Sequence, residues 1–99
     1  MDFGFDERTE ELRTVLVEFM DAHVYPAEAV YNEQLAALEN RWAWSTVPVL
    51  AELRAEARAR GLWNLFLPGE HGAGLTNLQY APLAEVTGRS LGLAPAALC

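Results

Sequence analysis

The chain has 99 residues, 52% of them hydrophobic, and a formal net charge of −7 at pH 7, so it suits one small globular domain and leaves no room for a second. The acidic balance argues against a nucleic-acid partner, which would require a basic patch, and is typical of a soluble surface. One cysteine, Cys99, cannot form an internal disulfide, and no signal peptide or run of ~20 apolar residues is present, so we expect a cytoplasmic protein without a transmembrane segment.

Ala, Leu, Glu and Arg are abundant and β-branched residues are few, which favours an all-α fold. The first predicted helix runs from about Glu7 to His23, with Asp6 as its N-cap. Tyr25-Pro26 is expected to end it, because the residue before a proline disfavours the helical conformation. Its apolar residues recur three and four apart, as one buried face requires: Leu12, Val15, Leu16, Phe19, Met20 and Val24.

A second helix is predicted from about Ala27 to Glu39, since proline at 26 can begin a helix. Its inward-facing residues are expected to be Val30, Tyr31, Leu35 and Leu38. The linker over 39–44 contains Trp42 and Trp44, which either cover the core or contact a partner domain or ligand.

The third predicted helix begins near Ser45-Thr46, carries Pro48 in its first turn and ends at Arg60. Its apolar stripe comprises Val49, Leu50, Leu53 and Ala57. We expect an ion pair between Glu56 and Arg60, four residues apart.

Three arginines, Arg54, Arg58 and Arg60, cluster near the end of this helix. They lie near the negative end of the helix dipole, where positive charges are stabilised. We expect these three side chains to form a solvated face. Phosphate binding is the alternative.

A glycine-rich turn follows, and the rest of the chain is organised around it. Gly61 is predicted to close the third helix in the left-handed conformation, and Gly74 to have a positive φ. The largely apolar residues 62–67 are expected to be buried. Thr76 and Gln79 have the spacing of a capping box, so the last helix should begin there.

The turn itself offers two weak chemical alternatives. Residues 72–76 precede a helix and could bind an anion, but they match no known phosphate loop, so a structural turn is expected. Glu70-His71 could be an acid–base pair, but no supported nucleophile accompanies it, and His71 is expected to hold the turn. The histidine and cysteine spacing fits no metal site. No catalytic, cofactor-binding or metal-ligating residue is nominated.

Pro82 lies inside the last predicted helix, where it removes a backbone donor, and a kink or break is expected there. Glycines and Pro95 weaken the helical pattern beyond Ser90. The stretch Leu91–Cys99 has no charge and no evident partner, whereas domain ends are usually polar. We infer that residues 1–99 are a fragment truncated at its carboxyl end.

Two runs carry a family resemblance: Gly61-Leu62-Trp63-Asn64-Leu65-Phe66-Leu67-Pro68 and Glu70-His71-Gly72-Ala73-Gly74-Leu75-Thr76-Asn77-Leu78-Gln79-Tyr80-Ala81-Pro82-Leu83-Ala84-Glu85. Together with Tyr25-Pro26-Ala27-Glu28 and 39–42 they resemble the amino-terminal helical domain of acyl-CoA dehydrogenases. Within the family they are most like the long-chain branch of acyl-CoA dehydrogenase family members 10 and 11. The resemblance implies a small bundle of about four helices with the glycine-rich turn before the last one.

The resemblance also implies a function for the parent protein. It would be an FAD-dependent oxidoreductase of fatty-acid metabolism and β-oxidation, dehydrogenating fatty acyl-CoA between its α and β carbons. An electron-transfer acceptor and a homo-oligomer are implied as well. This domain would line the acyl channel, with Pro95, Ala96 and Cys99 as substrate-lining residues by position. It would pack on a middle and a carboxy-terminal domain, which hold the catalytic base and flavin contacts. The fragment alone would be inactive and would bind no FAD.

Two alternatives stay open. The chain could be a stand-alone acidic helical module for protein interaction. It could also be a small ligand-binding domain that uses the aromatic residues Trp42, Trp44 and Trp63.

Overall fold

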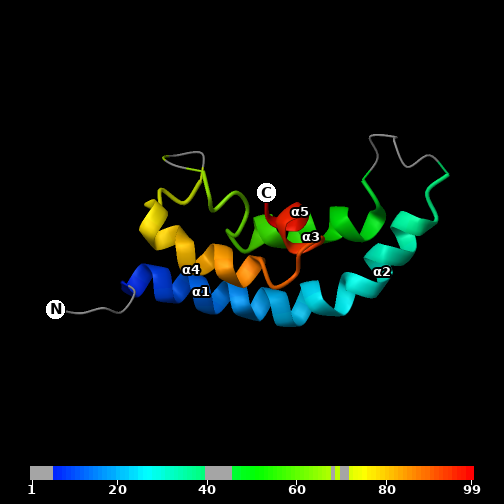
Figure 1. Cartoon of the computed structure of the whole chain (residues 1–99). Helices are drawn as coiled ribbons and strands as arrows, with labels where there is room; N and C mark the ends of the chain where they lie inside the picture. Colours follow the sequence, from blue (N-terminus) through cyan, green and yellow to red (C-terminus); the bar gives the residue numbers. More distant parts are fainter. Residues whose placement is uncertain (1–5, 40–45, 68, 70–71) are drawn as a thin grey trace.

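The computed structural model describes residues 6–39, 46–67, 69 and 72–99. Their regular elements are α1 (Glu7–Phe19), the π-helical turn η1 (Met20–Val24), α2 (Tyr25–Ala36), α3 (Pro48–Ala59), α4 (Asn77–Thr87) and α5 (Ala94–Leu98). The predicted all-α fold is confirmed. The molecule is elongated, with extents of 55 × 26 × 20 Å. Figure 1 shows α4 lying beside α1 in the same direction, while α3 returns along α2.

The first three elements form one unbroken rod. Asp6 caps α1 as predicted, because its Oδ1 accepts a hydrogen bond from the Thr9 amide at 2.8 Å. The predicted break at Tyr25-Pro26 is wrong, since Tyr25 has helical angles of φ −59° and ψ −43°. Its amide donates to the Met20 carbonyl, five residues back. This π-type turn takes up the irregularity that a proline introduces into a helix, so the rod continues.

The core lies between this rod, α4 and α3. The predicted stripe of the first helix is buried at its carboxyl end, where Phe19 and Val24 have no exposed surface. α4 contributes Leu83 and Val86 from one side. All four predicted residues of α3 are buried as well: Val49, Leu50, Leu53 and Ala57.

One hydrogen-bonded joint ties the amino ends of α1 and α4 together. Thr76 and Gln79 form the predicted capping box, with the Gln79 amide donating to Thr76 Oγ1 at 3.1 Å. The Gln79 side chain also donates to Asp6 Oδ2 at 2.8 Å. A single carboxylate therefore serves the caps of both helices, which fixes their shared direction.

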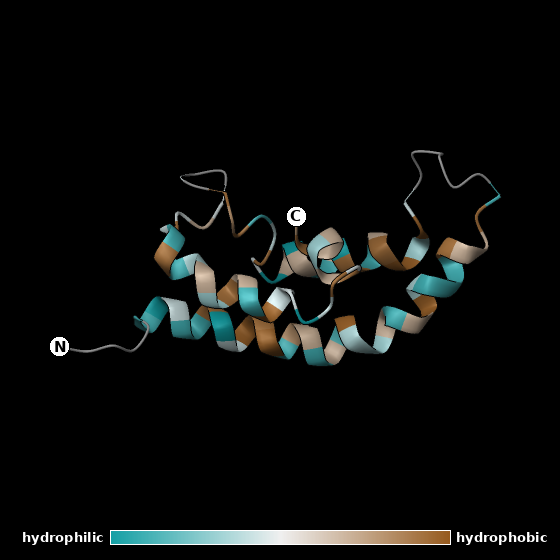
Figure 2. Cartoon of the chain, viewed as in Figure 1, coloured by the Kyte–Doolittle hydropathy of each residue, from teal (hydrophilic) through white to brown (hydrophobic). Residues whose placement is uncertain are grey.

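α2 is less covered than its sequence predicts. It ends at Ala36 rather than Glu39, and Val30 and Leu35 are 41% and 39% exposed, so the prediction that both face inward is wrong. Tyr31 and Leu38 do pack against the core. Figure 2 shows hydrophobic and hydrophilic residues interleaved around α2, so no single neighbour can cover all of its apolar side chains.

α3 begins differently from the prediction. Its N-cap is Val47, which provides no side-chain cap, rather than Ser45 or Thr46. Gln34 of α2 supplies the acceptor instead, taking a hydrogen bond from the Val49 amide at 2.9 Å. A side chain from another helix thus replaces the missing local cap. Ser45 lies outside the described residues, as do Trp42 and Trp44.

The far end of α3 follows the sequence more closely. The helix ends at Ala59 with Arg60 as its C-cap, and Gly61 has the predicted left-handed conformation with φ +72°. Glu56 and Arg60 form the expected ion pair at 3.3 Å.

The run 62–67 is only partly buried, contrary to the prediction. Leu62 and Leu65 belong to the core, whereas Phe66 is 47% exposed. Asn64, with φ +58°, turns the chain within the run, so its apolar side chains cannot all face one way. Gly74 has the predicted positive φ, +67°. Pro68, Glu70 and His71 lie outside the described residues.

The carboxyl end differs from the sequence predictions in two respects. Of the kink or break expected at Pro82, the break is ruled out because α4 continues through it, and Leu78, the residue whose carbonyl loses its bond, is 84% exposed and open to water. The stretch 91–99 is not left without a partner, because α5 packs on α3. Its buried residues are Leu93, Ala94, Ala97 and Leu98. Small alanines allow this close approach, which residue periodicity alone does not reveal.

Within the described ranges, no helix has the length and apolar character needed to cross a membrane.

We expect Gly74→Val to lower the free energy of unfolding by about 1 to 3 kcal/mol, because a β-branched residue is strained at positive φ. Thermal or urea unfolding followed by circular dichroism measures this. Gly92→Ala is the control, since Gly92 has no positive φ and a Cβ there meets nothing within 4 Å. Equal stability of the two variants would show that the turn tolerates side chains.

The joint at Asp6 also predicts a pH dependence. Hydrogen bonds from Gln79, and then from Thr9, hold the pKa of the Asp6 carboxyl below its ordinary value of 3.8. The charged form is favoured by folding, so its contribution to stability is present above pH 3.8 and is lost as the pH falls through the folded pKa. The melting-temperature advantage over Asp6→Asn should therefore shrink from about pH 6 to about pH 2.

Glu11→Gln removes the same charge from the exposed side of α1 and corrects for net charge. An advantage over Asp6→Asn that stays constant down to about pH 2 would mean that the carboxylate charge is not used in the joint.

Candidate functional site

The three predicted substrate-lining residues lie at the carboxyl end of the chain. Pro95 and Ala96 are in α5, and Cys99 is its C-cap. Pro95 and Cys99 are exposed and Ala96 is half-buried, while their neighbours Ala97 and Leu98 enter the core. One side of α5 is thus anchored, and the predicted residues are on the more accessible side.

Two hydrogen bonds fix the carboxyl end of α5. Arg54 Nε of α3 donates to the Ala96 carbonyl at 3.0 Å. The backbone amide of Asn64 donates to the Leu98 carbonyl at 2.8 Å. Both acceptors are terminal carbonyls, which have no partner within a helix of this length. α5 is therefore capped by residues far away in the sequence.

Trp63 connects two of the clustered arginines. The Arg58 guanidinium lies 4.4 Å and that of Arg54 5.9 Å from the centre of the Trp63 ring, both within cation–π range. The prediction of a purely solvated basic face is wrong for Arg54, which is half-buried and bonded to α5. Arg60 instead pairs with Glu56. Arg54 and Arg60 are thus already bonded within the domain, which argues against a phosphate site built from all three arginines.

Cys99 is not activated for chemistry. Burial raises the pKa of its thiol, so it stays protonated at neutral pH and is a poor nucleophile. Burial also raises the pKa of Tyr80, and the negative charge of ionised Cys99 adds to that effect. The two groups therefore lie close together in a partly desolvated environment, which suits an apolar contact better than acid–base work.

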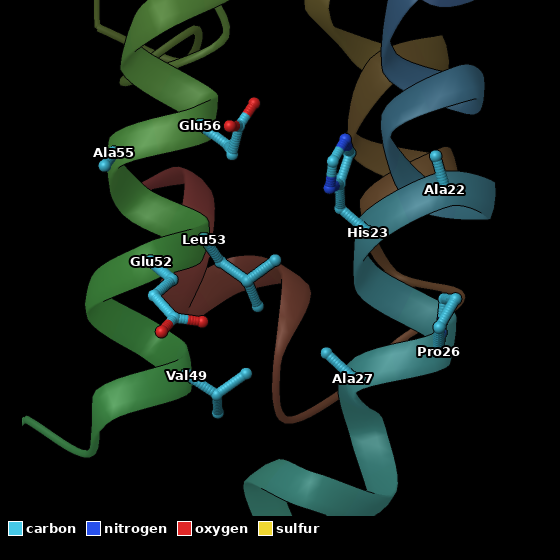
Figure 3. A pocket seen from close by; sticks show the side chains of 9 residues that line it. All are labelled: Ala22, His23, Pro26, Ala27, Val49, Glu52, Leu53, Ala55 and Glu56. Carbon is cyan, nitrogen blue, oxygen red and sulfur yellow. The ribbon is translucent and has the colours of Figure 1, made fainter.

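A groove of about 590 Å³ lies between η1–α2 and α3. Figure 3 shows its two walls, with Val49 and Leu53 pointing across toward Ala27. His23 and Glu56 extend toward each other from opposite sides. Nine residues line it: Ala22, His23, Pro26, Ala27, Val49, Glu52, Leu53, Ala55 and Glu56.

The groove combines an apolar floor with a polar rim. His23 is half-buried, and its ring is tilted against that of Phe19, with the ring centres 5.5 Å apart. Glu52 and Glu56 stand on α3 four residues apart, a spacing that places both on one face. The spacing of the two glutamates can be recognised in the sequence. The position of η1 as the opposite wall of the groove cannot be predicted from it. The carboxylates disfavour an anionic ligand such as a phosphate.

None of Pro95, Ala96 and Cys99 lines this groove, so the predicted site and the groove are separate features of α5 and α3. Over the described ranges, no three His, Cys, Asp or Glu residues are grouped so that they could hold a metal ion. His71, predicted to hold the glycine turn, lies outside those ranges.

Comparisons with known proteins converge on one group. The chain is 47% identical over 98 residues to "Probable acyl-CoA dehydrogenase FadE2" of Mycobacterium tuberculosis, covering 99% of this chain and 23% of that protein. It is 42% identical to mouse acyl-CoA dehydrogenase family member 10, covering 89% of this chain and 8% of that protein. No protein-family model matches the chain.

A solved structure agrees in both sequence and shape. A protein of Mycobacterium abscessus assigned as an acyl-CoA dehydrogenase is 46% identical and superposes with a TM-score of 0.78, over 97% of this chain and 25% of that one. The chain therefore spans about a quarter of the length of this protein and of FadE2.

Cys99 provides a test of the environment at α5, because it is the only cysteine. We expect alkylation by iodoacetamide to reach half its maximal rate at a higher pH in the folded chain than in the urea-unfolded chain, since burial raises the thiol pKa. Mass spectrometry gives the rates. An equal or lower midpoint in the folded chain would show an activated thiol instead.

Proposed function

Because the chain is homologous to a segment of acyl-CoA dehydrogenases, we propose that it is the amino-terminal helical part of an FAD-dependent enzyme that dehydrogenates fatty acyl-CoA thioesters. The observation that carries this proposal is 46% identity combined with a TM-score of 0.78 over nearly the whole chain. The acyl thioester is dehydrogenated between its α and β carbons, and an electron-transfer acceptor takes the electrons.

The proposed role of α5 is to form part of the wall of the acyl channel. Pro95, Ala96 and Cys99 present small or apolar groups on its accessible side, and partial burial raises the pKa of the thiol, which is uncharged at neutral pH. Such a surface suits a hydrocarbon chain, because it offers apolar contact without an unpaired charge.

The proposed role of α2 and the adjoining groove is to pack on the rest of the enzyme. α2 has no buried residue, and Val30 and Leu35 remain substantially exposed. FadE2 and the Mycobacterium abscessus protein are about four times as long as this chain, so other domains are available to cover these residues. Burying apolar side chains at about 25 cal/mol per Å² favours such an interface.

The described residues do not fit FAD. The groove between η1–α2 and α3 carries Glu52 and Glu56 at its rim, and these carboxylates repel a pyrophosphate. A helix start with a glycine-rich phosphate loop after a strand is also lacking among the described residues. We therefore assign the flavin contacts and the catalytic base to the remainder of the enzyme.

The cytoplasmic location and the homo-oligomeric state of the complete enzyme are part of the same proposal. The single cysteine supports the former. The latter rests on the resemblance alone.

A chimera tests the proposed function. This chain replaces the matching segment of the Mycobacterium abscessus protein, and the intact protein is measured in parallel. We expect the chimera to purify with FAD and to reduce an artificial electron acceptor only when a fatty acyl-CoA is added. The same protein lacking the segment should lose this activity, because the helical wall is missing.

The 99-residue chain alone is the second control and should retain no flavin. Stoichiometric FAD in that chain would overturn the assignment of flavin contacts to other domains. A chimera that holds FAD but shows no acyl-CoA-dependent reduction, beside an active intact protein, would contradict the proposed function and favour an interaction module.

A further inference from the structure

α5 cannot fix its own position. It has five residues and no side-chain N-cap, and so short a helix is not stable in isolation. Its place on the molecule must therefore come from the contacts that it makes with α3 and the following turn.

Those contacts are of two kinds. Ala94, Ala97 and Leu98 are buried, but alanines offer little surface to resist sliding along α3. The two hydrogen bonds to the Ala96 and Leu98 carbonyls are directional and fix the register.

Only one of these bonds comes from a side chain. Asn64 uses its backbone amide, whereas Arg54 uses Nε, across 42 positions of sequence. The Arg54 guanidinium is charged, half-buried and close to the Trp63 ring, which restricts its motion. Arg54 is thus the side chain that connects the body of the domain to the backbone of α5.

From this geometry we propose that Arg54 is a positioning residue that fixes the backbone of α5 at Ala96 and thereby sets the acyl chain length that the enzyme prefers. The inference rests on the proposed function, because it takes α5 as a wall of the acyl channel. A wall that shifts enough to admit or exclude one methylene group changes kcat/KM for the affected substrate by about tenfold or more.

The first test concerns the contact itself and needs no enzyme activity. In the 99-residue chain, Arg54→Ala should speed hydrogen exchange of the Ala97 and Cys99 amides by about tenfold, relative to amides of α1. Arg89→Ala is the matched control, since Arg89 pairs with Glu85 on α4. Arg58→Ala removes a cation on Trp63 while leaving the bond to Ala96, and should also leave α5 protected.

The second test measures specificity in the chimera with the Mycobacterium abscessus protein. The ratio of kcat/KM for long over short acyl-CoA substrates should change by about tenfold in Arg54→Ala, with FAD content and melting temperature near those of the unaltered chimera. Arg89→Ala should leave the ratio unchanged. A merely structural role would lower activity for all chain lengths equally, so the ratio separates the two.

Unchanged exchange at Ala97 and Cys99 would overturn the role of Arg54 in holding α5. Faster exchange with an unaltered chain-length ratio would overturn its role in specificity. An inactive but FAD-loaded unaltered chimera would instead refute the proposed function, and the specificity claim with it, while the exchange result would still report the contact.

Discussion

The fold depends on burying one apolar stripe in the middle of a long helical rod. Leu16, Phe19, Met20 and Val24 are 0–1% exposed, and each such side chain stabilises the fold by about 1.5 to 3 kcal/mol. The exposed ion pair between Glu56 and Arg60 contributes about 0.2 to 1 kcal/mol at most. Burial therefore decides the arrangement: α4 covers the stripe along α1, and α3 lies farther along the rod, beside α2 (Figure 1).

The π-helical turn lies where this stripe and Pro26 meet. In a straight α-helix the Pro26 ring would clash with the carbonyl four residues back, yet a break would carry Val24 out of the core. The five-residue spacing from Met20 to Tyr25 accommodates both demands. The same turn places His23 in the wall of the groove (Figure 3). The π-helical turn therefore also shapes a surface that we propose for domain packing.

The candidate functional surfaces are formed by the parts of the helices that the core does not bury. α3 buries Leu53 and Ala57 toward the rod, and its other side is available for Arg54 to hold α5. α2 extends beyond α3 and retains exposed apolar residues. In our proposal α5 faces the substrate and α2 faces the rest of the enzyme. The catalytic groups lie in neither element. That division fits a chain spanning about a quarter of the length of FadE2 and of the Mycobacterium abscessus protein.

Features that depend on a few neighbouring residues could be predicted from the sequence alone. The Asp6 cap, the Thr76–Gln79 capping box and the positive φ of Gly61 and Gly74 each depend on local geometry. The family resemblance and the all-α class were also readable, because they rest on composition and contiguous motifs.

Tertiary structure decided the features that depend on distant partners. The helix through Pro26 and the one through Pro82 continue because packing outweighs one missing hydrogen bond. The Gln34 cap on α3 and the Arg54 bond to α5 join residues 15 and 42 positions apart. The sequence determined the helical class of most segments and where α1 and α4 begin, but not the helix α5 at Ala94–Leu98. Only the folded chain decided which apolar faces are covered, because coverage depends on which neighbour lies opposite.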